Sequence, residues 1–301
     1  MSYFIECGPE DGLQQIIDGL PDDGQEAQIL LREGVYGQRL IIRRNNTALR
    51  GAGMDRTVLT GSLAAREILE DGFRRGTFRT FTVMTDADRM TLTDLTIENT
   101  ACPLEEAGQA IALYADGPRV TVENCRLRSF QDTLFTAPLP EKEIEPRGFI
   151  GPKEKAPRTP SSQLYRGCVI EGQIDFIFGG AQALFERCDI VSVDGRADRS
   201  APCAGYVCAP STFPAQAEGY RFEDCRFLGR GVADQSVFLA RPWREGAMAV
   251  FVRCEMGPHI HPEGFCDWAD RGKNGTVRFL EKGCFGPGAQ GERVSFAGKA
   301  P

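Results

Sequence analysis

Two aspartates offer the clearest chemistry in the sequence. Asp132 follows a glutamine in the segment SFQDTLF, and Asp175 lies inside the apolar segment IEGQIDFIFG. A carboxylate buried without a partner is strongly unfavourable, so Asp175 needs a cation or a catalytic task. Arg241, in the segment RPW, can supply the cation. If the two residues pair, Asp175 stays anionic and can attack a carbonyl carbon as a nucleophile.

A second carboxyl group beside the nucleophile would divide the acid–base work. Two carboxylates about 5 Å apart cannot both ionise freely, so one pKa rises and the other falls. With Asp175 held by Arg241, Asp132 would carry the proton and donate it to the departing alcohol. Gln131 and Gln109 would stabilise an oxyanion, because neutral amides do not quench the nucleophile. The alternatives are a structural ion pair and a stacked ladder of amides that satisfies the backbone.

Other hydrolase chemistries fit the sequence poorly. It contains no GxSxG or HExxH motif and no CxxC or His/Cys cluster with zinc spacing. We therefore expect no metal site. His259 and His261 are the only histidines and share the loop segment GPHIHPEG, where a solvated turn is the expected structure.

Composition indicates a predominantly β protein. The 34 glycines and 18 prolines separate short aliphatic, β-branched runs such as RLIIR and RVTVEN. Residues 10–20 are predicted to form a helix, since Leu13, Ile16, Ile17 and Leu20 recur at helical spacing. The net charge of −7 argues against nucleic acid but allows an acidic polysaccharide in a local cationic groove. The sequence contains no run of 18 apolar residues, so it predicts no membrane-spanning helix.

The N-terminus and the cysteines bear on location. The segment MSYFIECGPEDG lacks the basic and apolar regions of a secretory signal. The chain has 11 cysteines, an odd number, which we expect to be reduced thiols. These features predict a cytoplasmic protein, or a secreted one if the natural N-terminus is longer.

Six cysteines share a local pattern of a polar residue or glycine, the cysteine, any residue and then usually a large apolar one. They are Cys125, Cys168, Cys188, Cys225, Cys254 and Cys284. Their intervals of 43, 20, 37, 29 and 30 residues indicate a repeat architecture. The segment NTAC around Asn99 is a candidate for an earlier, degenerate rung. Unrelated core cysteines are the alternative reading.

The repeat predicts an all-β protein with a right-handed parallel β-helix, formed as a single domain by residues 1–301. Each coil would hold roughly 20 residues plus a loop, and coils would stack about 4.8 Å apart. The thiols would then form an internal ladder. A solenoid must cover the ends of its core, so the helix at residues 10–20 is a candidate N-terminal cap. The tail after Gly286 is a candidate C-terminal cap, and a β-sandwich is the main alternative fold.

This fold converts sequence spacing into proximity. Gln109 and Gln131 are 22 residues apart, or about one coil. Asp132 and Asp175 are 43 apart, but residues 137–163 contain six prolines and nine charged residues and are predicted to be an insertion loop near the site. Without it, the two aspartates fall on neighbouring coils. Lys153, Lys155 and Arg158 in this loop are either solvated or a cationic clamp for an acidic substrate.

These segments carry a family resemblance. Over nearly its whole length, from residues 32–37 to residues 266–268, the chain resembles pectin methylesterases (pectinesterases) of bacterial type. Six segments match in order: REGVYG, GQAIAL, QDTLF, IEGQIDFIFG, LARPWR and HIHPEGF. The resemblance implies a right-handed parallel β-helix that needs no metal or organic cofactor.

The resemblance also implies roles for individual residues. Asp175 matches the nucleophile, Asp132 the acid/base and Arg241 the arginine that orients the nucleophile. Gln131 matches the oxyanion donor and Gln109 a second glutamine of the site. The implied substrate-binding residues are a sugar-stacking Trp243 and a groove lined by Phe178 and Phe135. The sequence departs from the family pattern at four positions: Gln173, Gly180, Ala240 and Phe135.

The implied reaction is hydrolysis of the C6 methyl ester of galacturonate units in pectin or methylated oligogalacturonides. Methanol is released through an acyl-enzyme on Asp175. The expected partner is thus an acidic polysaccharide, with no nucleic acid or membrane involved, and the protein is expected to be a monomer. The rivals are an esterase for a different ester and a catalytically silent carbohydrate-binding β-helix. A pectate lyase is disfavoured because the sequence shows no acidic calcium cluster.

Overall fold

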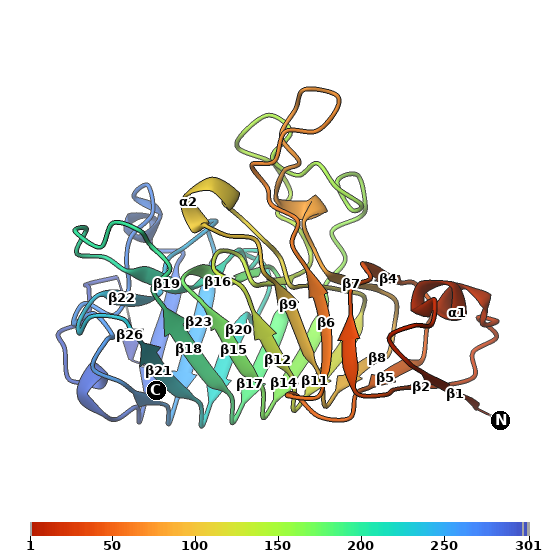
Figure 1. The fold of residues 1–301 in the computed structure, drawn as a ribbon. Helices are drawn as coiled ribbons and strands as arrows, with labels where there is room; N and C mark the ends of the chain where they lie inside the picture. The colour runs from red at the N-terminus through yellow and green to blue at the C-terminus, as the bar shows by residue number, and fades with distance from the viewer. Residues whose placement is uncertain (1, 297, 300–301) are drawn as a thin grey trace.

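The computed structural model describes residues 2–296 and 298–299, which wind into a right-handed parallel β-helix (Figure 1). Each full coil contributes one strand to each of three sheets, here named A, B and C. Neighbouring strands in every sheet pair in parallel, so backbone donors and acceptors are satisfied between coils. The predicted all-β fold is confirmed.

Sheet A contains β1 (Tyr3–Cys7), β2 (Ala27–Leu31), β5 (Thr47–Arg50), β8 (Met90–Thr93), β11 (Arg119–Glu123), β14 (Ser162–Arg166), β17 (Gln182–Glu186), β20 (Tyr220–Glu223), β23 (Met248–Val252), β25 (Arg278–Lys282) and β26 (Gly298–Lys299). Sheet B contains β3 (Gly34–Tyr36), β6 (Thr57–Gly61), β9 (Thr96–Asn99), β12 (Arg126–Arg128), β15 (Val169–Gly172), β18 (Asp189–Val193), β21 (Arg226–Arg230) and β24 (Glu255–Met256). Sheet C contains β4 (Leu40–Ile42), β7 (Val83–Asp86), β10 (Leu113–Asp116), β13 (Leu134–Thr136), β16 (Ile174–Gly179), β19 (Gly205–Pro210) and β22 (Val237–Ala240). The helical segments are α1 (Leu13–Gly19), α2 (Leu104–Ala107), η1 (Thr77–Arg79), η2 (Arg271–Asn274) and η3 (Pro287–Ala289).

The cysteine ladder is confirmed and explains the local pattern. Residues one position after the cysteines pair across sheet B in continuous register, from Arg126 through Val169, Asp189 and Arg226 to Glu255 and Phe285. The residue before each cysteine has a φ between 49° and 64°, a left-handed conformation that favours Gly, Asn and Asp: Asn124, Gly167, Arg187, Asp224, Arg253 and Gly283. The chain must turn at this point, so the polar residue or glycine belongs to the turn and the cysteine points inward.

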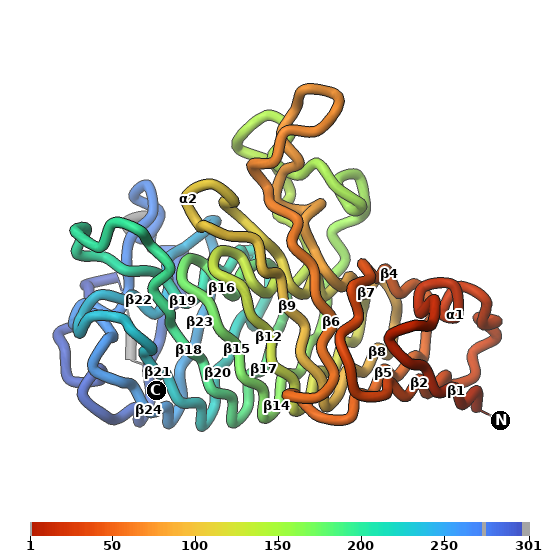
Figure 2. Tube along the Cα trace, in the orientation of Figure 1, coloured from red at the N-terminus to blue at the C-terminus, as the bar shows by residue number. Residues whose placement is uncertain are grey.

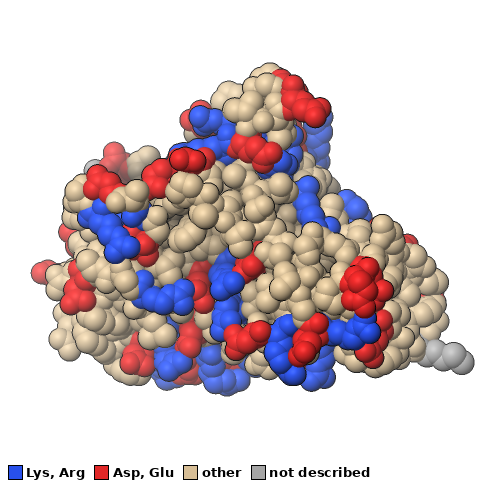
Figure 3. Space-filling view, viewed as in Figure 1, with Lys and Arg blue, Asp and Glu red and all other residues tan. Residues whose placement is uncertain are grey.

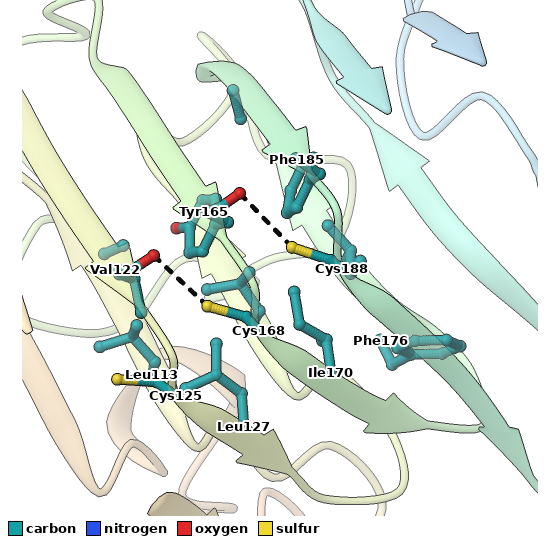
Figure 4. Packing of buried hydrophobic residues seen from close by; sticks show 14 of the residues in the cluster. Leu113, Val122, Cys125, Leu127, Tyr165, Cys168, Ile170, Phe176, Phe185 and Cys188 are labelled. Atoms are coloured by element: carbon teal, nitrogen blue, oxygen red, sulfur yellow. Dashed lines mark hydrogen bonds between the residues drawn. The ribbon is translucent and has the colours of Figure 1, made fainter. Parts of the chain in front are cut away.

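The thiols donate hydrogen bonds within the core. Cys168 Sγ donates to Val122 O at 3.3 Å, and Cys188 Sγ donates to Tyr165 O at 3.4 Å (Figure 4). No disulfide joins the 11 cysteines, all of which lie in the described part of the chain. The proposed early rung at NTAC is wrong. Thr96 pairs with Arg126, so Leu95 occupies that rung.

An aromatic stack on sheet A escaped the sequence analysis. Tyr165, Phe185, Phe222 and Phe251 pair in register on β14, β17, β20 and β23. Their rings stack with centroids 4.5–5.0 Å apart and interplanar angles of 11° or less. Parallel in-register strands place equivalent side chains directly above one another, which favours such stacks.

Both ends of the core are covered. Leu13 and Ile17 of α1 are buried, and α1 packs beside β4 at the N-terminal coil, as predicted (Figure 1). At the other end Val294 and Phe296 pack against the core, while residues 297 and 300–301 lie outside the described residues. Among the residues that the structure describes, no helix is long and apolar enough to cross a lipid bilayer.

Side chains of opposite charge lie together on the face that sheet B presents (Figure 3). Ion pairs connect neighbouring coils there, for example Arg226 with Asp189 and Arg128 with Glu98. Two long loops rise from the molecule beside this face, residues 62–82 and residues 137–161 (Figure 2). They follow β6 and β13, respectively, and both reach the site described below.

Candidate active site

Asp132 and Asp175 occupy equivalent positions on neighbouring coils. Leu134 of β13 pairs with Ile177 of β16, and each aspartate lies two residues before its member of this pair. Gln131 forms an additional parallel bridge with Ile174. The spacing argument therefore predicted the proximity of the two carboxyl groups correctly, since the 43-residue interval is one coil plus the loop of residues 137–161.

The backbone aims both carboxyl groups outward through an unusual local conformation. Asp132 has a φ of 65° and Asp175 a φ of 49°, both in the left-handed region that aspartate tolerates better than most residues. At Asp175 the register with β19 also shifts between Ile174 and Ile177, which is a β-bulge. Bulges interrupt the in–out alternation of a strand and redirect a side chain, and this one lies at the proposed nucleophile.

Arg241 binds Asp175 through a bidentate ion pair. Its Nε and Nη2 donate to Asp175 Oδ1 and Oδ2 at 2.8 and 2.5 Å. The guanidinium carbon lies 3.8 Å from the ring centroid of Tyr206 and 3.9 Å from that of Trp268. Burial lowers the pKa of Arg241, but the hydrogen bond and charge of Asp175 outweigh it and leave that pKa raised. The arginine is therefore a fixed cation that holds the Asp175 carboxylate in one orientation.

Asp132 has the opposite electrostatic environment. Its side chain is buried, and the pKa of Asp132 is raised well above its ordinary value, first by burial and then by the charge of Asp175. The positive charge of Arg241 acts in the opposite direction without cancelling the rise. Burial and the neighbouring charge thus favour the protonated form of Asp132, while Asp175 is the carboxyl group that Arg241 binds. The two carboxyl groups therefore have different environments, one beside a bound cation and one buried without it.

The dyad opens into a cavity of about 210 Å³ on the outer face of sheet C. Its lining contains seven of the eight predicted site residues, together with others that the sequence analysis did not single out. The full set is Thr77, Phe78, Gln109, Gln131, Asp132, Gly148, Asp175, Phe178, Ala209, Arg241, Trp243 and Trp268. Among the described residues, no side chain hydrogen-bonds the Gln109 or Gln131 amide, so both can donate into the cavity.

Phe135 does not line this cavity, contrary to expectation. It is fully buried between Tyr114 and Phe178, with ring centroids 4.7 and 4.9 Å away, and Phe78 covers it at 5.0 Å. Phe135 supports the aromatic wall from below. The wall itself is formed by Phe178 and Trp243, whose rings meet edge to face at 5.6 Å.

Gln173 and Lys153 were also singled out from the sequence, and neither lines the cavity. Gln173 flanks the nucleophile but does not line the cavity: its Nε2 donates to Ala204 O at 2.9 Å, and Gly195 N donates to its Oε1 at 2.8 Å. It therefore holds the loop of residues 194–204. Of the proposed cationic clamp, Lys153 pairs with Asp86 and Asp116 instead.

The expected solvated turn is wrong for His259. This side chain is 2% exposed, neither ring nitrogen has a partner among the described residues, and burial lowers the pKa of His259 to about 4. Its neighbour His261 is partly exposed and stacks on Phe238 with ring centroids 4.2 Å apart. Neither histidine lines the cavity, so the site relies on carboxyl, amide and guanidinium groups.

Known proteins resemble this chain over most of its length. The chain matches the family model described as Pectinesterase over residues 8–139 and 158–301. It is 30% identical to the probable pectinesterase/pectinesterase inhibitor 64 of Arabidopsis thaliana over 96% of this chain and 46% of that protein. It is 29% identical to the pectinesterase QRT1 of the same plant over 95% of this chain and 69% of that protein. The chain spans about half the length of the first curated relatives it matches.

Solved structures share the fold. The pectin methylesterase PemA from Erwinia chrysanthemi superposes with a TM-score of 0.77 at 25% identity, covering 99% of this chain and 92% of that chain. A mutant pectin methylesterase in complex with a hexasaccharide gives a TM-score of 0.79 at 23% identity, covering 100% of this chain and 93% of that chain.

Proposed function

The chain belongs to the pectinesterase family, and we propose that it hydrolyses the C6 methyl ester of galacturonate units in pectin or methylated oligogalacturonides, releasing methanol. The observation that carries the proposal is the Asp175–Arg241 ion pair beside Asp132, whose pKa is raised, in one cavity. A nucleophile and a proton donor are thereby available together in one site.

The first step forms the acyl-enzyme. An Asp175 oxygen attacks the ester carbonyl carbon, and the carbonyl oxygen becomes an oxyanion that accepts hydrogen bonds from the amides of Gln131 and Gln109. The C–O bond to the methoxy group breaks, and Asp132 transfers its proton to the departing oxygen, which leaves as methanol. The product is an anhydride between the Asp175 carboxyl and the galacturonate carboxyl.

The second step restores the enzyme. Asp132, now a carboxylate, removes a proton from water, and the water oxygen attacks the galacturonate carbonyl carbon of the anhydride. The bond to Asp175 breaks, which returns the carboxylate to Arg241 and leaves the free galacturonate acid. Trp243 and Phe178 offer apolar faces to the sugar ring, so that binding energy can orient the ester over Asp175.

The proposal also covers the oligomeric state, the binding partners and the cellular location of the protein. We expect a monomer that acts on an acidic saccharide and involves neither nucleic acid nor a membrane. We also expect a reducing, cytoplasmic location, because all 11 cysteines are free. Fractionation of the native host tests the location, and activity recovered from the culture medium would contradict it.

The test is methanol release from highly methylated pectin and from methylated oligogalacturonides, with Asp175→Asn as the inactive variant. Asp189→Asn is the matched control, because Asp189 forms an equally bidentate pair with Arg226 (2.7 and 2.6 Å) on the exposed surface of sheet B. We expect release by the wild type and the control and loss of release in Asp175→Asn. Equal release by both variants would refute the assignment of the nucleophile.

A further inference from the structure

The outer face of sheet C carries a continuous apolar row that leads to the site. Ile41, Met84, Tyr114, Phe135, Phe178 and Ala209 pair in register across six adjacent strands, from β4 to β19. Their chain neighbours Val83, Leu113 and Ile177 point into the coil core, so this row points out. A saccharide chain lying along the β-helix axis over the dyad would have to follow this row.

Two loops close over part of the row and form an arch. Residues 62–82 follow β6, residues 137–161 follow β13, and both rise together from the molecule (Figures 1 and 2). Phe78 of the first loop meets Phe149 of the second edge to face at 5.9 Å. Higher up, the Arg147 guanidinium lies 4.0 Å from the centre of the Phe73 ring. The loops come from coils on either side of β10 and contact each other across it.

The arch seals the row on one side of the dyad. Met84, Tyr114 and Phe135 are fully buried although they lie on an outer sheet face, and they pack in one cluster with Phe78 and Phe149. The row first contributes to the cavity at Phe178, on the strand that carries Asp175. Thr77, Phe78 and Gly148 of the arch line the cavity directly. The cavity therefore ends at the arch.

The arch is anchored to the strands beneath it. Lys153 Nζ lies 2.6 Å from Asp86 Oδ1 and 3.3 Å from Asp116 Oδ2, at the ends of β7 and β10. Arg158 donates to four carbonyl oxygens of the same loop, those of Pro140, Lys153, Glu154 and Ala156. The loop of residues 137–161 is thus held by ion pairs and hydrogen bonds as well as by its aromatic contacts.

We propose that the arch makes this site act at the end of a saccharide chain, so that the substrates are short methylated oligogalacturonides or the termini of longer chains. The inference rests on the proposed function. Neighbouring strands lie about 4.8 Å apart, which is close to the length of one sugar unit. The buried Phe135 is one strand from Phe178, so at most about one further unit fits between the reacting ester and the arch. Ligand sites usually measure about 300–1,000 Å³, and the 210 Å³ cavity suits one ring.

Part of the arch lies outside the family pattern. The family model matches residues 8–139 and 158–301 and omits residues 140–157, which include Phe149 and Lys153. The half of the arch that crosses the row therefore lies outside the part of the chain that the family model matches. It can be shortened without removing a strand.

The test is the position of the first ester removed from a fully methylated galacturonate hexamer, read by tandem mass spectrometry. We expect the new carboxylate at one end of the hexamer, and a kcat/KM per ester at least tenfold higher for the hexamer than for the polymer. Carboxylates scattered over internal units at low conversion would overturn the proposal. Absence of methanol from every substrate would overturn the proposed function and this inference together, so the two failures are distinct.

Two variants test whether the arch causes the preference for chain ends. Replacing residues 141–157 by a short Gly/Ser turn should spread cleavage to internal units and raise the polymer-to-hexamer ratio of kcat/KM at least tenfold. Phe149→Ala, which keeps the loop length, should shift the ratio in the same direction by a smaller factor. Ile144→Ala is the matched control in the same loop, because Ile144 is 60% exposed and should leave the pattern unchanged. An end-specific pattern that persists in both arch variants would overturn the role of the arch.

Discussion

Replacing Arg241 by methionine should lower the unfolding free energy, because the Asp175 carboxylate is then buried without a partner. The ion-paired side chains of Arg241 and Asp175 are 17% and 8% exposed. Removing one partner of such a pair leaves an uncompensated charge and costs about 3–5 kcal/mol of unfolding free energy. Methionine keeps most of the apolar volume between Tyr206 and Trp268, so the loss reports chiefly on charge. Activity should vanish with it, because the nucleophile loses its orientation.

The double-mutant cycle with Asp175→Asn separates charge from packing. In the Asp175→Asn background the buried carboxylate is gone, so Arg241→Met should cost only about 1–2 kcal/mol, the value of the two cation–π contacts. The coupling energy should therefore be about 1–4 kcal/mol. Urea denaturation of the four proteins at pH 8 measures it. A coupling near zero would refute the reasoning.

The stability of the Arg241→Met variant should depend on pH in a defined direction. Without Arg241, the folded protein binds a proton at the buried carboxyl more readily than the unfolded chain does. Unfolding then releases that proton, so the stability deficit of Arg241→Met should shrink as the pH falls from 8 to 5. Titrating groups that do not interact with Arg241 are common to the wild type and the variant and cancel in the difference. Asp132 does not cancel, because its pKa rises further when the positive charge of Arg241 is removed. A deficit that is constant with pH would show that packing, not charge, dominates.

Two further predictions concern the other titrating groups of the fold. Burial lowers the pKa of His259 to about 4, against an ordinary 6.5, so the unfolding free energy of the wild type should fall by roughly 3 kcal/mol between pH 6.5 and pH 4. In His259→Leu this contribution is absent, so the fall measured by denaturation should be smaller by that amount. The same pH dependence in both proteins would contradict the role of His259. Asp132→Asn should lower kcat by about 10²–10⁴. Because the pKa of Asp132 is raised in the folded protein, this variant should match the wild type in stability at pH 4 and exceed it at pH 8; lower stability at pH 8 would argue for a structural carboxylate.

The sequence predicted the parts of this molecule that repeat. Stacked parallel coils convert an interval in the sequence into a distance in space, so the cysteine intervals and the 43-residue interval between Asp132 and Asp175 were sufficient to place them. The helix at Leu13–Gly19 was predictable for a similar reason, because its apolar residues recur at helical spacing.

The parts that loops bring together could not be predicted in the same way. Trp268 and Tyr206 reach Arg241 from different coils, and no periodicity relates them. Phe78 belongs to a long loop whose path depends on its contact with Phe149. The burial of His259 follows from its packing on two glycines: a Cβ at Gly229 or Gly257 would approach its ring to 2.9–3.0 Å. Such contacts depend on tertiary structure and leave no local signal.

The β-helix also explains why the carboxyl dyad requires its arginine. In-register stacking places Asp132 and Asp175 at equivalent positions of adjacent coils, so two like charges would meet at one strand spacing, about 4.8 Å. The thiol and aromatic ladders gain from this proximity, whereas ionised carboxylates would repel. Arg241 reduces the conflict by pairing with one carboxylate, and burial raises the pKa of the other carboxyl group. The stacking that stabilises the solenoid thereby places the two carboxyl groups in the unlike environments on which the proposed catalysis depends.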